Sequence, residues 1–393
     1  MRILILHSRY LSGSTSGENR VVEDEAKLLA EAGHDVRVWA PSPQVSGVVS
    51  GLRLGASAVW SRSAARRVEE MIREHRAEVV HVHNLFPLLS PSVLRSSRAA
   101  GAAVVVTLHN YRFLCLPASF LRAGTVCERC LGRFPWPGVA HRCYRGSALG
   151  SAALAASLSL HRTVRSFDTV SLFLPVSEFV RRKYVEGGFP EERLVVKPNF
   201  TWPLEPRAGA GSYFLYLGRL SPEKGVDTLL RAWRLGRREH DLVVVGDGPE
   251  APALRRGSVA GVQFRAGVPA SEVPQLLAGA RAVLVPSRWY EAAPRVIVEA
   301  FAAGVPVIAS RIGALPDLVR DGEAGILVPP DDPPAWARAT ARLEDDAECR
   351  RLGEGARAIW SQRHSPEQGL RGLEAAYERA RSVAPGNLGG AGE

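Results

Sequence analysis

The chain has 393 residues, 46% of them hydrophobic, which predicts two domains, or three, with full cores. No stretch approaches the roughly 20 apolar residues of a membrane span, and the opening MRILILHSRY is expected to be a first strand, not a signal peptide. The net charge of +10 falls on residues 1–200, with 26 Lys and Arg against 16 Asp and Glu, because residues 201–393 hold 24 of each.

This asymmetry indicates that the N-terminal half meets an anionic partner, although arginine usage can also reflect genomic composition. Nucleic acid fits poorly, because the basic residues are scattered and no nucleic-acid motif is present. A phosphorylated acceptor or an anionic membrane surface fits better. On the expected helix 61–78, the arginines at helical spacing could share one face, although a solvated face is the simpler interpretation because four glutamates lie on the same helix. These arginines are Arg62, Arg66, Arg73 and Arg76.

Short apolar, β-branched runs alternate with helix-length segments along the chain. In the first half these runs are RILILH, DVRVWA, VVHVHN, AVVVTLHN, SLFLPVS and RLVVKPNF. In the second half they are YFLYLGRL, DLVVVGDGP, GVQFRAG, AVLVPS, PVIAS and GILVPP. Strands that are apolar on both faces predict parallel sheets covered by helices. The predicted fold class is therefore α/β, with two doubly wound, Rossmann-like domains that bind ligands at the carboxyl ends of their strands.

The segment 199–212, NFTWPLEPRAGAGS, is rich in Pro, Gly and Ala and predicts a linker. We therefore expect an acceptor-binding domain over 1–200 and a nucleotide-sugar domain over 201–365. A C-terminal helix is expected over 366–382 and a disordered tail over 383–393. The alanine-rich stretch 147–162 predicts a packed helix.

Four of the five cysteines fall within 29 residues of an insert at about 111–146, namely Cys115, Cys127, Cys130 and Cys143. Disulfides are not expected in a chain without a leader. Tetrahedral thiolate coordination of a structural zinc is one interpretation. The alternative is four reduced, partly buried cysteines.

The stretch YEAAPRVIVEAFAAGVPVIAS, which starts at Tyr290, holds two glutamates eight positions apart. Pro294 suits the first turn of a helix and Gly304 its end, so we expect a helix over roughly 294–303. Glu291 then lies in the loop before the helix and Glu299 in its second turn. The free N–H groups of the first turn favour an anion, and the carboxylates can accept bonds from neighbouring hydroxyls. The pattern predicts a ligand with phosphate and diol groups.

In YLGRLSPEKGVDTLLRAW, Arg219 and Lys224 flank a Ser-Pro turn between a strand and a helix. Two cations at this place can neutralise a diphosphate, although exposed basic residues without a function are common. The glycine turn VGDGPE that follows a later strand is a weak signal, because it lacks the full spacing of a dinucleotide-binding motif.

GRLSPEKG, VGDGPE and EAAPRVIVE, in this order, resemble the fourth family of nucleotide-sugar glycosyltransferases, which are retaining enzymes of GT-B fold. SGENRVVEDEAKLLAEAGHDVRV is similar to that family's first loop and helix, and VVHVHN, VVTLHNYR and VKPNF to its later segments. The resemblance covers nearly the whole chain. A similar four-cysteine insert occurs in a subset of the family. Here the insert follows the strand that carries His109, so it is expected to shape the acceptor pocket and to do no chemistry.

The resemblance implies a role for each matching residue. Arg219 and Lys224 would hold the donor diphosphate and stabilise its departure, and Glu299 would accept bonds from the ribose. The other implied donor contacts are Glu291 to sugar hydroxyls, the N–H of Val296 to phosphate, Gly17 in the N-terminal loop, and His109 near the reacting carbon. Two motifs depart from the family's pattern, with Ser16-Gly17 in place of a glycine pair and Ala292-Ala293-Pro294 in place of Gly-Phe-Gly.

The implied reaction is retaining, metal-independent hexosyl transfer from a nucleotide-sugar to a glycan, lipid-linked or small-molecule acceptor, in bacterial glycoconjugate biosynthesis. No catalytic metal is expected, because cations stand in place of an Asp-x-Asp motif. The expected location is cytoplasmic, with peripheral contact to the inner face of an anionic membrane, and no nucleic acid is expected as a partner. The alternatives are an epimerase or phosphorylase of the same architecture and a non-catalytic glycan-binding or scaffold protein.

Overall fold

The structure is a computed structural model that describes residues 1–9, 17–42, 48–236 and 238–383. The chain folds into two compact units, which are treated one at a time. Unit 1 comprises Met1–Ser119, Glu128–Lys197 and Leu370–Glu393, and unit 2 comprises Phe120–Cys127 and Pro198–Gly369. The end of the chain therefore returns to the unit in which it began.

Unit 1 contains a five-stranded sheet in the order β2-β1-β3-β4-β7, and every pair of neighbouring strands is parallel. The strands are β1 (Arg2–His7), β2 (Asp35–Trp39), β3 (Val79–Asn84), β4 (Ala103–Leu108) and β7 (Leu172–Pro175). β3 and β4 are buried along their whole length, which explains why their sequences are apolar without alternation.

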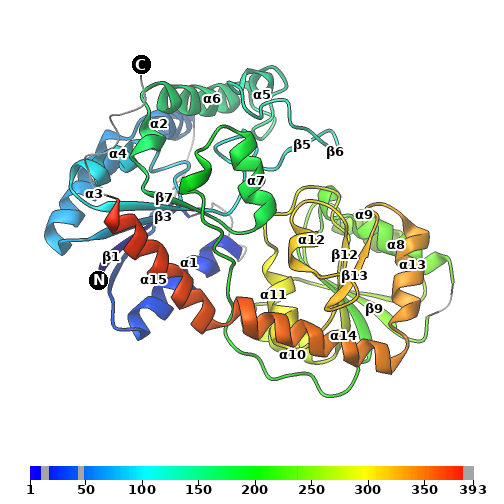
Figure 1. Ribbon diagram of the computed structural model, residues 1–393. Helices are drawn as coiled ribbons and strands as arrows, with labels where there is room; N and C mark the ends of the chain where they lie inside the picture. The colour runs from blue at the N-terminus through cyan, green and yellow to red at the C-terminus, as the bar shows by residue number, and fades with distance from the viewer. Residues whose placement is uncertain (10–16, 43–47, 237, 384–393) are drawn as a thin grey trace. The chain divides into compact units, whose positions relative to one another are not determined.

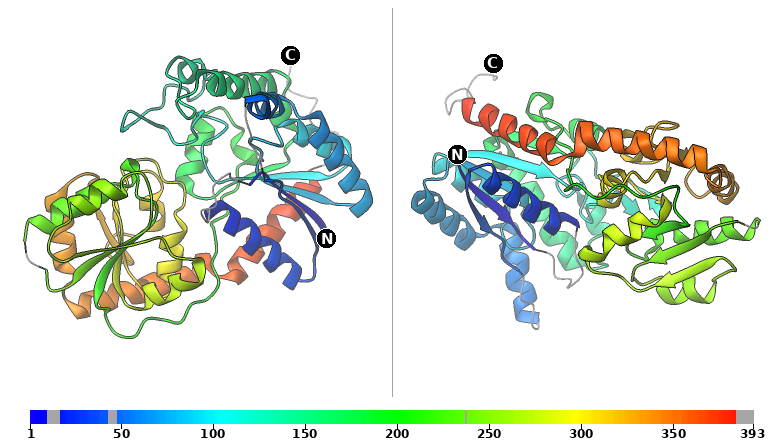
Figure 2. Two further views of the ribbon diagram at one scale, coloured as in Figure 1. Left: turned by 180° about the vertical axis from the view of Figure 1, so that it is seen from behind. Right: turned by 90° about the horizontal axis from the view of Figure 1, so that it is seen from below.

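Helices cover both faces of this sheet (Figures 1 and 2). On one face, α1 (Gly17–Glu31) and α15 (Pro366–Ser382) pack against alternate residues of the strands through Val22, Leu29, Leu373 and Tyr377. The other face is covered by α3 (Arg62–His75) and α4 (Ser92–Ala99), which are in contact with each other. Beyond them lie α2 (Val48–Val59) and α6 (Ala148–Thr163), and α7 (Glu178–Glu186) follows β7.

Unit 2 contains a six-stranded parallel sheet in the order β10-β9-β8-β11-β12-β13. Its strands are β8 (Tyr213–Leu217), β9 (Asp241–Val245), β10 (Val262–Arg265), β11 (Ala280–Val285), β12 (Val307–Ser310) and β13 (Gly325–Val328). Successive side chains point to opposite faces, so Leu215 and Val243 enter one core while Phe214 and Leu242 enter the other.

The first of these cores is closed by α10 (Val273–Ala278), α11 (Arg295–Ala302), α12 (Leu315–Leu318) and α14 (Asp346–Ile359). The second is closed by α8 (Val226–Arg234), α9 (Ala251–Arg256) and α13 (Pro333–Arg342). The predicted α/β architecture of two helix-covered parallel sheets is thus confirmed.

The cysteine-rich insert forms a small hairpin and a short helix. The hairpin pairs β5 (Leu121–Arg122) with β6 (Thr125–Val126) and belongs to unit 2, where the ring of Phe120 lies edge-on to that of Tyr290. The helix is α5 (Trp136–Ala140), and it packs against α6 in unit 1. The sequence indicated the insert but neither of these elements.

Two other expectations are not confirmed. The run RLVVKPNF was predicted to be a strand, and this was wrong: it forms a single bridge, between Leu194 and Phe173. The N–H groups of Val195 and Lys197 donate to the carbonyls of Phe173 and Pro175, but Pro198 has no N–H with which to continue the ladder. The expected disordered tail lies, apart from Val383, outside the described residues. Within the described part of the chain, no helix combines the length and hydropathy that crossing a bilayer requires.

Candidate active site

A buried ion pair lies at the carboxyl ends of β8 and β11 in unit 2. Nζ of Lys224, in the turn after β8, is 2.7 Å from Oε1 of Glu291, in the loop after β11. The hydroxyl of Ser287 donates to the same oxygen at 2.6 Å, and Nζ also lies 5.3 Å from the ring centroid of Trp289. β8 and β11 are neighbours in the sheet, so the fold brings together two charges that are 67 residues apart.

Glu291 is held in its ionised form. Burial alone would raise the pKa of its carboxyl, but the Lys224 ammonium and the hydrogen bonds from Lys224 and Ser287 outweigh burial and hold that pKa below its ordinary value. Only 7% of the Glu291 side chain is exposed, against 24% for Lys224. The lysine is therefore the member of the pair that solvent and ligands reach more easily.

The backbone at Glu291 is fixed by a close approach from the loop after β12. Gly313 has a φ of +60°, and a Cβ at that position would lie 2.8 Å from the Glu291 nitrogen. The next residue, Ala314, donates its N–H to the Glu291 carbonyl at 3.0 Å. A side chain at Gly313 would therefore displace the loop that carries the carboxylate.

Helix α11 begins and ends as its sequence predicts. Pro294 is the N-cap, and Gly304, with a φ of +68°, follows the C-cap residue. Glu291 lies before the helix and Glu299 in its second turn, where Arg295 pairs with the Glu299 carboxylate at 3.3 Å. Val296 is the second residue of the helix, in the turn whose N–H groups favour an anion.

Arg219 lies in the same turn as Lys224 and has an exposed side chain. Its carbonyl accepts a hydrogen bond of 2.7 Å from the hydroxyl of Tyr216, which holds the turn against β8. The glycines of VGDGPE serve a packing purpose here. A Cβ at Gly246 would lie 1.9 Å from the Gly218 carbonyl oxygen, so the turns after β8 and β9 touch through their backbones.

The candidate residues of unit 1 gather at the carboxyl ends of β1, β3 and β4. His109 directly follows β4, and its Nε2 lies 2.9 Å from Nδ1 of His83 on β3. Both histidines line a small cavity together with Asn84, Thr107, Leu108, Asn110 and Arg112. Gly17 is the exposed first residue of α1, and the next residue, Glu18, accepts a 2.9 Å bond from Asn110. Ser16 lies outside the described residues.

Each unit thus gathers its own part of the predicted site. Unit 2 brings Lys224 to Glu291 and unit 1 brings the start of α1 to the end of β4. Sequence reasoning missed Ser287, Trp289 and Gly313, although the PSRWYE spacing, with Ser287 four residues before Glu291, was available as a signal. It also missed His83, although this residue lies within the motif VVHVHN.

None of the five cysteines, all of which lie among the described residues, is in a disulfide. Cys115 and Cys130 are buried, whereas Cys127 and Cys143 are half-buried. Among the described residues, two groups of potential metal ligands have donor atoms within 4.8 Å of one another, and neither includes a cysteine: Glu25, His81 and His83 form one, and Glu239, His240 and Glu344 the other. Structural zinc on the cysteine quartet stays a prediction.

Both halves of the chain match models of sugar-transferring families. Residues 16–199 match the model described as glycosyl transferase 4-like domain, and residues 211–346 match the model described as glycosyl transferases group 1. The two matched ranges together cover most of both parallel sheets.

Curated relatives and solved structures agree with these matches. The chain is 29% identical to phosphatidyl-myo-inositol mannosyltransferase of Mycolicibacterium smegmatis, over 85% of this chain and 82% of that protein. It is 39% identical to D-inositol 3-phosphate glycosyltransferase of Corynebacterium glutamicum, over 36% and 37%. With two other curated relatives, the aligned stretch spans 19% and 60% of the relative's length, and both shares are less than two-thirds.

The fold is similar to that of Anabaena HepE crystallised with UDP, with a TM-score of 0.65, 20% identity, and coverage of 96% of this chain and 100% of that one. The two parallel sheets and this likeness give the GT-B fold. With one matching model in each half, the chain belongs to the group 1 glycosyltransferases.

Proposed function

We propose that the protein is a retaining glycosyltransferase that moves a sugar from a nucleotide-diphospho-sugar to a hydroxyl of a glycan, lipid-linked or natural-product acceptor. The Lys224–Glu291 pair carries the proposal. It sets a cation and an ionised hydrogen-bond acceptor 2.7 Å apart at the end of a parallel sheet, where such folds bind ligands. A diphospho-sugar needs both groups, because its phosphates are anionic and its sugar carries hydroxyls.

The remaining residues of unit 2 take the other parts of the donor. Arg219 adds a second cation beside Lys224 for the diphosphate, and the first turn of α11, with Val296, offers backbone N–H groups to the same anion. Glu299 accepts bonds from the ribose hydroxyls, and Arg295 keeps its carboxylate in place. The complex of HepE with UDP is consistent with a nucleotide-sugar donor.

In the proposed reaction the anomeric carbon–oxygen bond to the diphosphate breaks. A bond from the acceptor oxygen forms on the same face of the sugar, and the acceptor's proton passes to the departing phosphate oxygen. Lys224 and Arg219 then stabilise the charge that develops on the diphosphate, which is the part of catalysis that preorganised cations supply. In unit 1, His109 is proposed to contact the sugar near the reacting carbon, and Gly17, the first residue of α1, is proposed as a further donor contact.

The acceptor is proposed to bind unit 1, where the excess positive charge lies. Relatives named for phosphatidyl-myo-inositol and inositol 3-phosphate are consistent with an acceptor that carries phosphate. An acceptor linked to lipid would place the protein at a membrane surface. The exposed arginines of α3 are the proposed contact.

A hydrolysis screen tests the donor without knowledge of the acceptor. The purified protein is incubated with UDP-, GDP- and ADP-sugars, and nucleotide release is measured together with the configuration of the freed sugar by NMR. Slow release from one class, with the anomeric configuration retained, is the expected result. Conversion of a donor to its epimer would instead assign an epimerase, and the absence of both binding and turnover across the set would favour a non-catalytic protein.

A further inference from the structure

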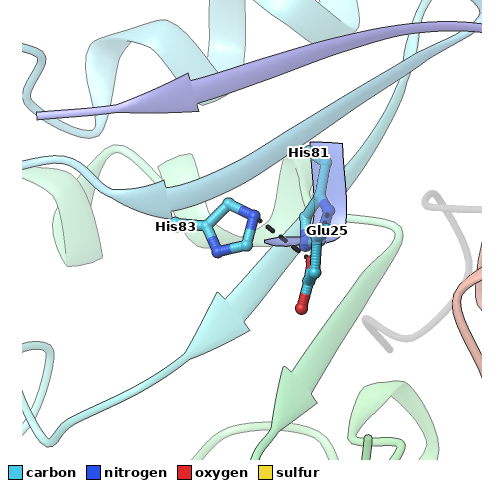
Figure 3. A group of neighbouring side chains, drawn as sticks. All are labelled: Glu25, His81 and His83. Carbon is cyan, nitrogen blue, oxygen red and sulfur yellow. Dashed lines mark ion pairs between the residues drawn. The ribbon is translucent and has the colours of Figure 1, made fainter. Parts of the chain in front are cut away.

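Four ionisable side chains form a cluster in the core of unit 1, and one of them, His83, contacts His109. Glu25 of α1 meets His81 and His83 of β3 (Figure 3), and Lys197, beyond β7, forms an ion pair with Oε1 of Glu25. The side chains of Glu25, His81 and His83 are wholly buried, and that of Lys197 is 3% exposed. Charges are rarely buried so completely, so the cluster calls for an explanation.

The arrangement resembles a metal site, but its chemistry argues against one. The ammonium of Lys197 already supplies the positive charge that a carboxylate needs, and a second cation beside it would be repelled. Both ring nitrogens of His81 are also occupied, Nδ1 by the hydroxyl of Tyr377 at 2.8 Å and Nε2 by that of Thr107 at 2.7 Å. His81 is thus a structural residue, and the chemistry of the cluster rests with Glu25 and His83.

Two buried atoms of the cluster have no hydrogen-bond partner among the residues that the structure describes, and they lie next to each other. They are Oε2 of Glu25 and Nε2 of His83, 3.5 Å apart. A carboxylate oxygen can only accept, so the proton of the His83 ring belongs on Nε2. Nδ1 of His83 is then an acceptor, and Nε2 of His109, 2.9 Å away, must carry the proton between them.

We propose that Glu25 and His83 are positioning residues that hold His109 as its Nε2–H tautomer, so that its Nδ1 accepts a hydrogen bond from a hydroxyl of the bound sugar or acceptor. This inference rests on the proposed function, and it adds the direction of the hydrogen bond. We call the chain of contacts from Glu25 through His83 to His109 the relay. Without it, the ring of His109 could flip or exchange tautomers, and an N–H donor would then stand where Nδ1 accepts. With it, His109 selects a hydroxyl over a carbonyl or ether oxygen.

The ionisation of the two histidines is consistent with the relay. Burial holds the pKa of both His83 and His109 well below the ordinary value, and the neighbouring charges act in the same direction. Both rings are therefore neutral near pH 7, and a neutral imidazole has one donor and one acceptor. A chain of two such rings transmits the direction that Glu25 sets.

The tautomer can be observed directly in the full-length protein. Histidine labelled with ¹⁵N in the ring distinguishes Nδ1–H from Nε2–H by NMR, and a His109→Gln variant assigns the signal. The wild-type protein is expected to show His109 as the Nε2–H form from pH 6 to 8. Finding the Nδ1–H form, or an equal mixture of the two, would overturn the proposal.

Three substitutions separate positioning from packing. In His83→Asn the amide oxygen takes the place of Nδ1 and still accepts from His109, whereas His83→Leu fills the space but cannot accept. We expect His83→Asn to keep the Nε2–H form with donor-hydrolysis kcat within a few-fold of wild type. His83→Leu should lose the preference and about 10- to 100-fold in kcat, the usual scale for residues that orient a functional histidine. His161→Asn, at a buried histidine bonded to Ser166 and the Val59 carbonyl, is the control and should leave kcat unchanged.

If His83→Leu disturbs folding, the double variant Glu25→Leu with Lys197→Leu provides a second route. It removes both buried charges together and leaves neither unpaired. Loss of the Nε2–H preference of His109 in this variant supports the relay, and its full retention would refute the role of Glu25. If no nucleotide-sugar is turned over, the proposed function fails, whereas the NMR result still decides the relay.

Discussion

Lys224 and Glu291 illustrate what a half-buried ion pair can do in a binding site. A charge removed from water is costly unless a partner compensates it, and the Lys224 ammonium is the partner that holds the pKa of Glu291 below its ordinary value against burial. An anionic ligand can then take over Lys224 as a partner, while Ser287 continues to hold Glu291. In the proposed function, the pair is therefore a preorganised site for the donor.

The substitution Lys224→Ala is expected to lower donor turnover by roughly 10²–10³-fold, because it removes one preorganised cation from the departing diphosphate. Hydrolysis kinetics on the donor found in the screen measure the effect. Lys183→Ala is the matched control, because Lys183 is also ion-paired, with Glu128 and Glu186, but in unit 1 away from the proposed donor contacts. A Lys224 variant that keeps activity within a few-fold of wild type would remove this residue from the mechanism.

Among single residues, the sequence predicts those whose roles follow from local patterns and misses those whose partners lie far away along the chain. Pro294, Glu299 and Gly304 were predictable because capping and helical spacing are local rules. The Glu25–Lys197 pair was not, because its members are 172 residues apart and charged residues are normally solvated. The role of Gly313 was not predictable either, because it depends on a close approach to the backbone of Glu291 from another loop.

At the scale of the elements, helix α15 completes one side of the core of unit 1. Its buried face contributes Leu373, Ala376, Tyr377 and Ala380 to the same cluster as β1, β3, β4 and β7. Tyr377 also binds His81, so the last helix of the chain supports the strand that carries His83. The helix was predictable from its periodicity, but its attachment to unit 1 was not, because an apolar helical face does not indicate which surface it packs against.

Leu373→Ala is expected to destabilise unit 1 by about 2–5 kcal/mol, through lost burial and the cavity left behind. Glu378→Ala, at an exposed position of the same helix, should stay within about 0.5 kcal/mol of wild type. Urea denaturation followed by tryptophan fluorescence compares the two variants. Equal midpoints would show that α15 does not belong to the core of unit 1.

Helix α3 carries three arginines of the expected face, Arg62, Arg66 and Arg73, whereas Arg76 is the C-cap residue beyond the helix and has a left-handed backbone. Arg62, Arg66, Arg73 and Arg76 are all exposed. Glu69 lies among them at helical spacing and pairs with Arg73 at 3.5 Å, while Glu70 and Glu74 pair with Arg67. The face therefore keeps an excess of positive charge, and each basic residue is worth about 1 kcal/mol near an anionic bilayer.

We expect the protein to sediment with vesicles of phosphatidylserine and phosphatidylcholine at low salt and to be released at high salt, because the attraction is screened. Replacing the four arginines with glutamine should weaken sedimentation and leave donor hydrolysis intact. The control replaces four exposed arginines of unit 2: Arg255, Arg256, Arg265 and Arg320. If wild type fails to sediment even at low salt, a soluble acceptor becomes the better proposal.

For the molecule as a whole, the buried histidines make stability depend on pH. Burial lowers the pKa of His81 to about 3 and those of His161 and His364 to about 4. In the unfolded chain these rings titrate near 6.5, so between pH 6.5 and 4 the unfolded state binds more protons than the folded one. Stability is thus fully present above pH 6.5 and is lost as the pH falls through this window.

Each of these histidines contributes about 1.4 kcal/mol per pH unit inside the window, so the Tm should fall steeply between pH 6.5 and 5. Calorimetry over this range measures the slope. His364→Asn keeps an amide donor at the position of Nδ1 for the Asn199 carbonyl but cannot titrate, and it should flatten the slope for unit 2. A Tm that is constant from pH 7 to pH 5 would contradict the prediction.

The return of the chain to unit 1 at Leu370 has a consequence for synthesis in the cell. The strands of unit 1 are synthesised before the main part of unit 2, but α15, which covers one of their apolar faces together with α1, is synthesised after the whole of unit 2. At ordinary translation rates the interval is roughly 10 to 30 seconds, which is long compared with the collapse of a domain. The nascent chain therefore carries an uncovered hydrophobic surface throughout that time. Chaperone binding and aggregation during overexpression are expected to act on this surface.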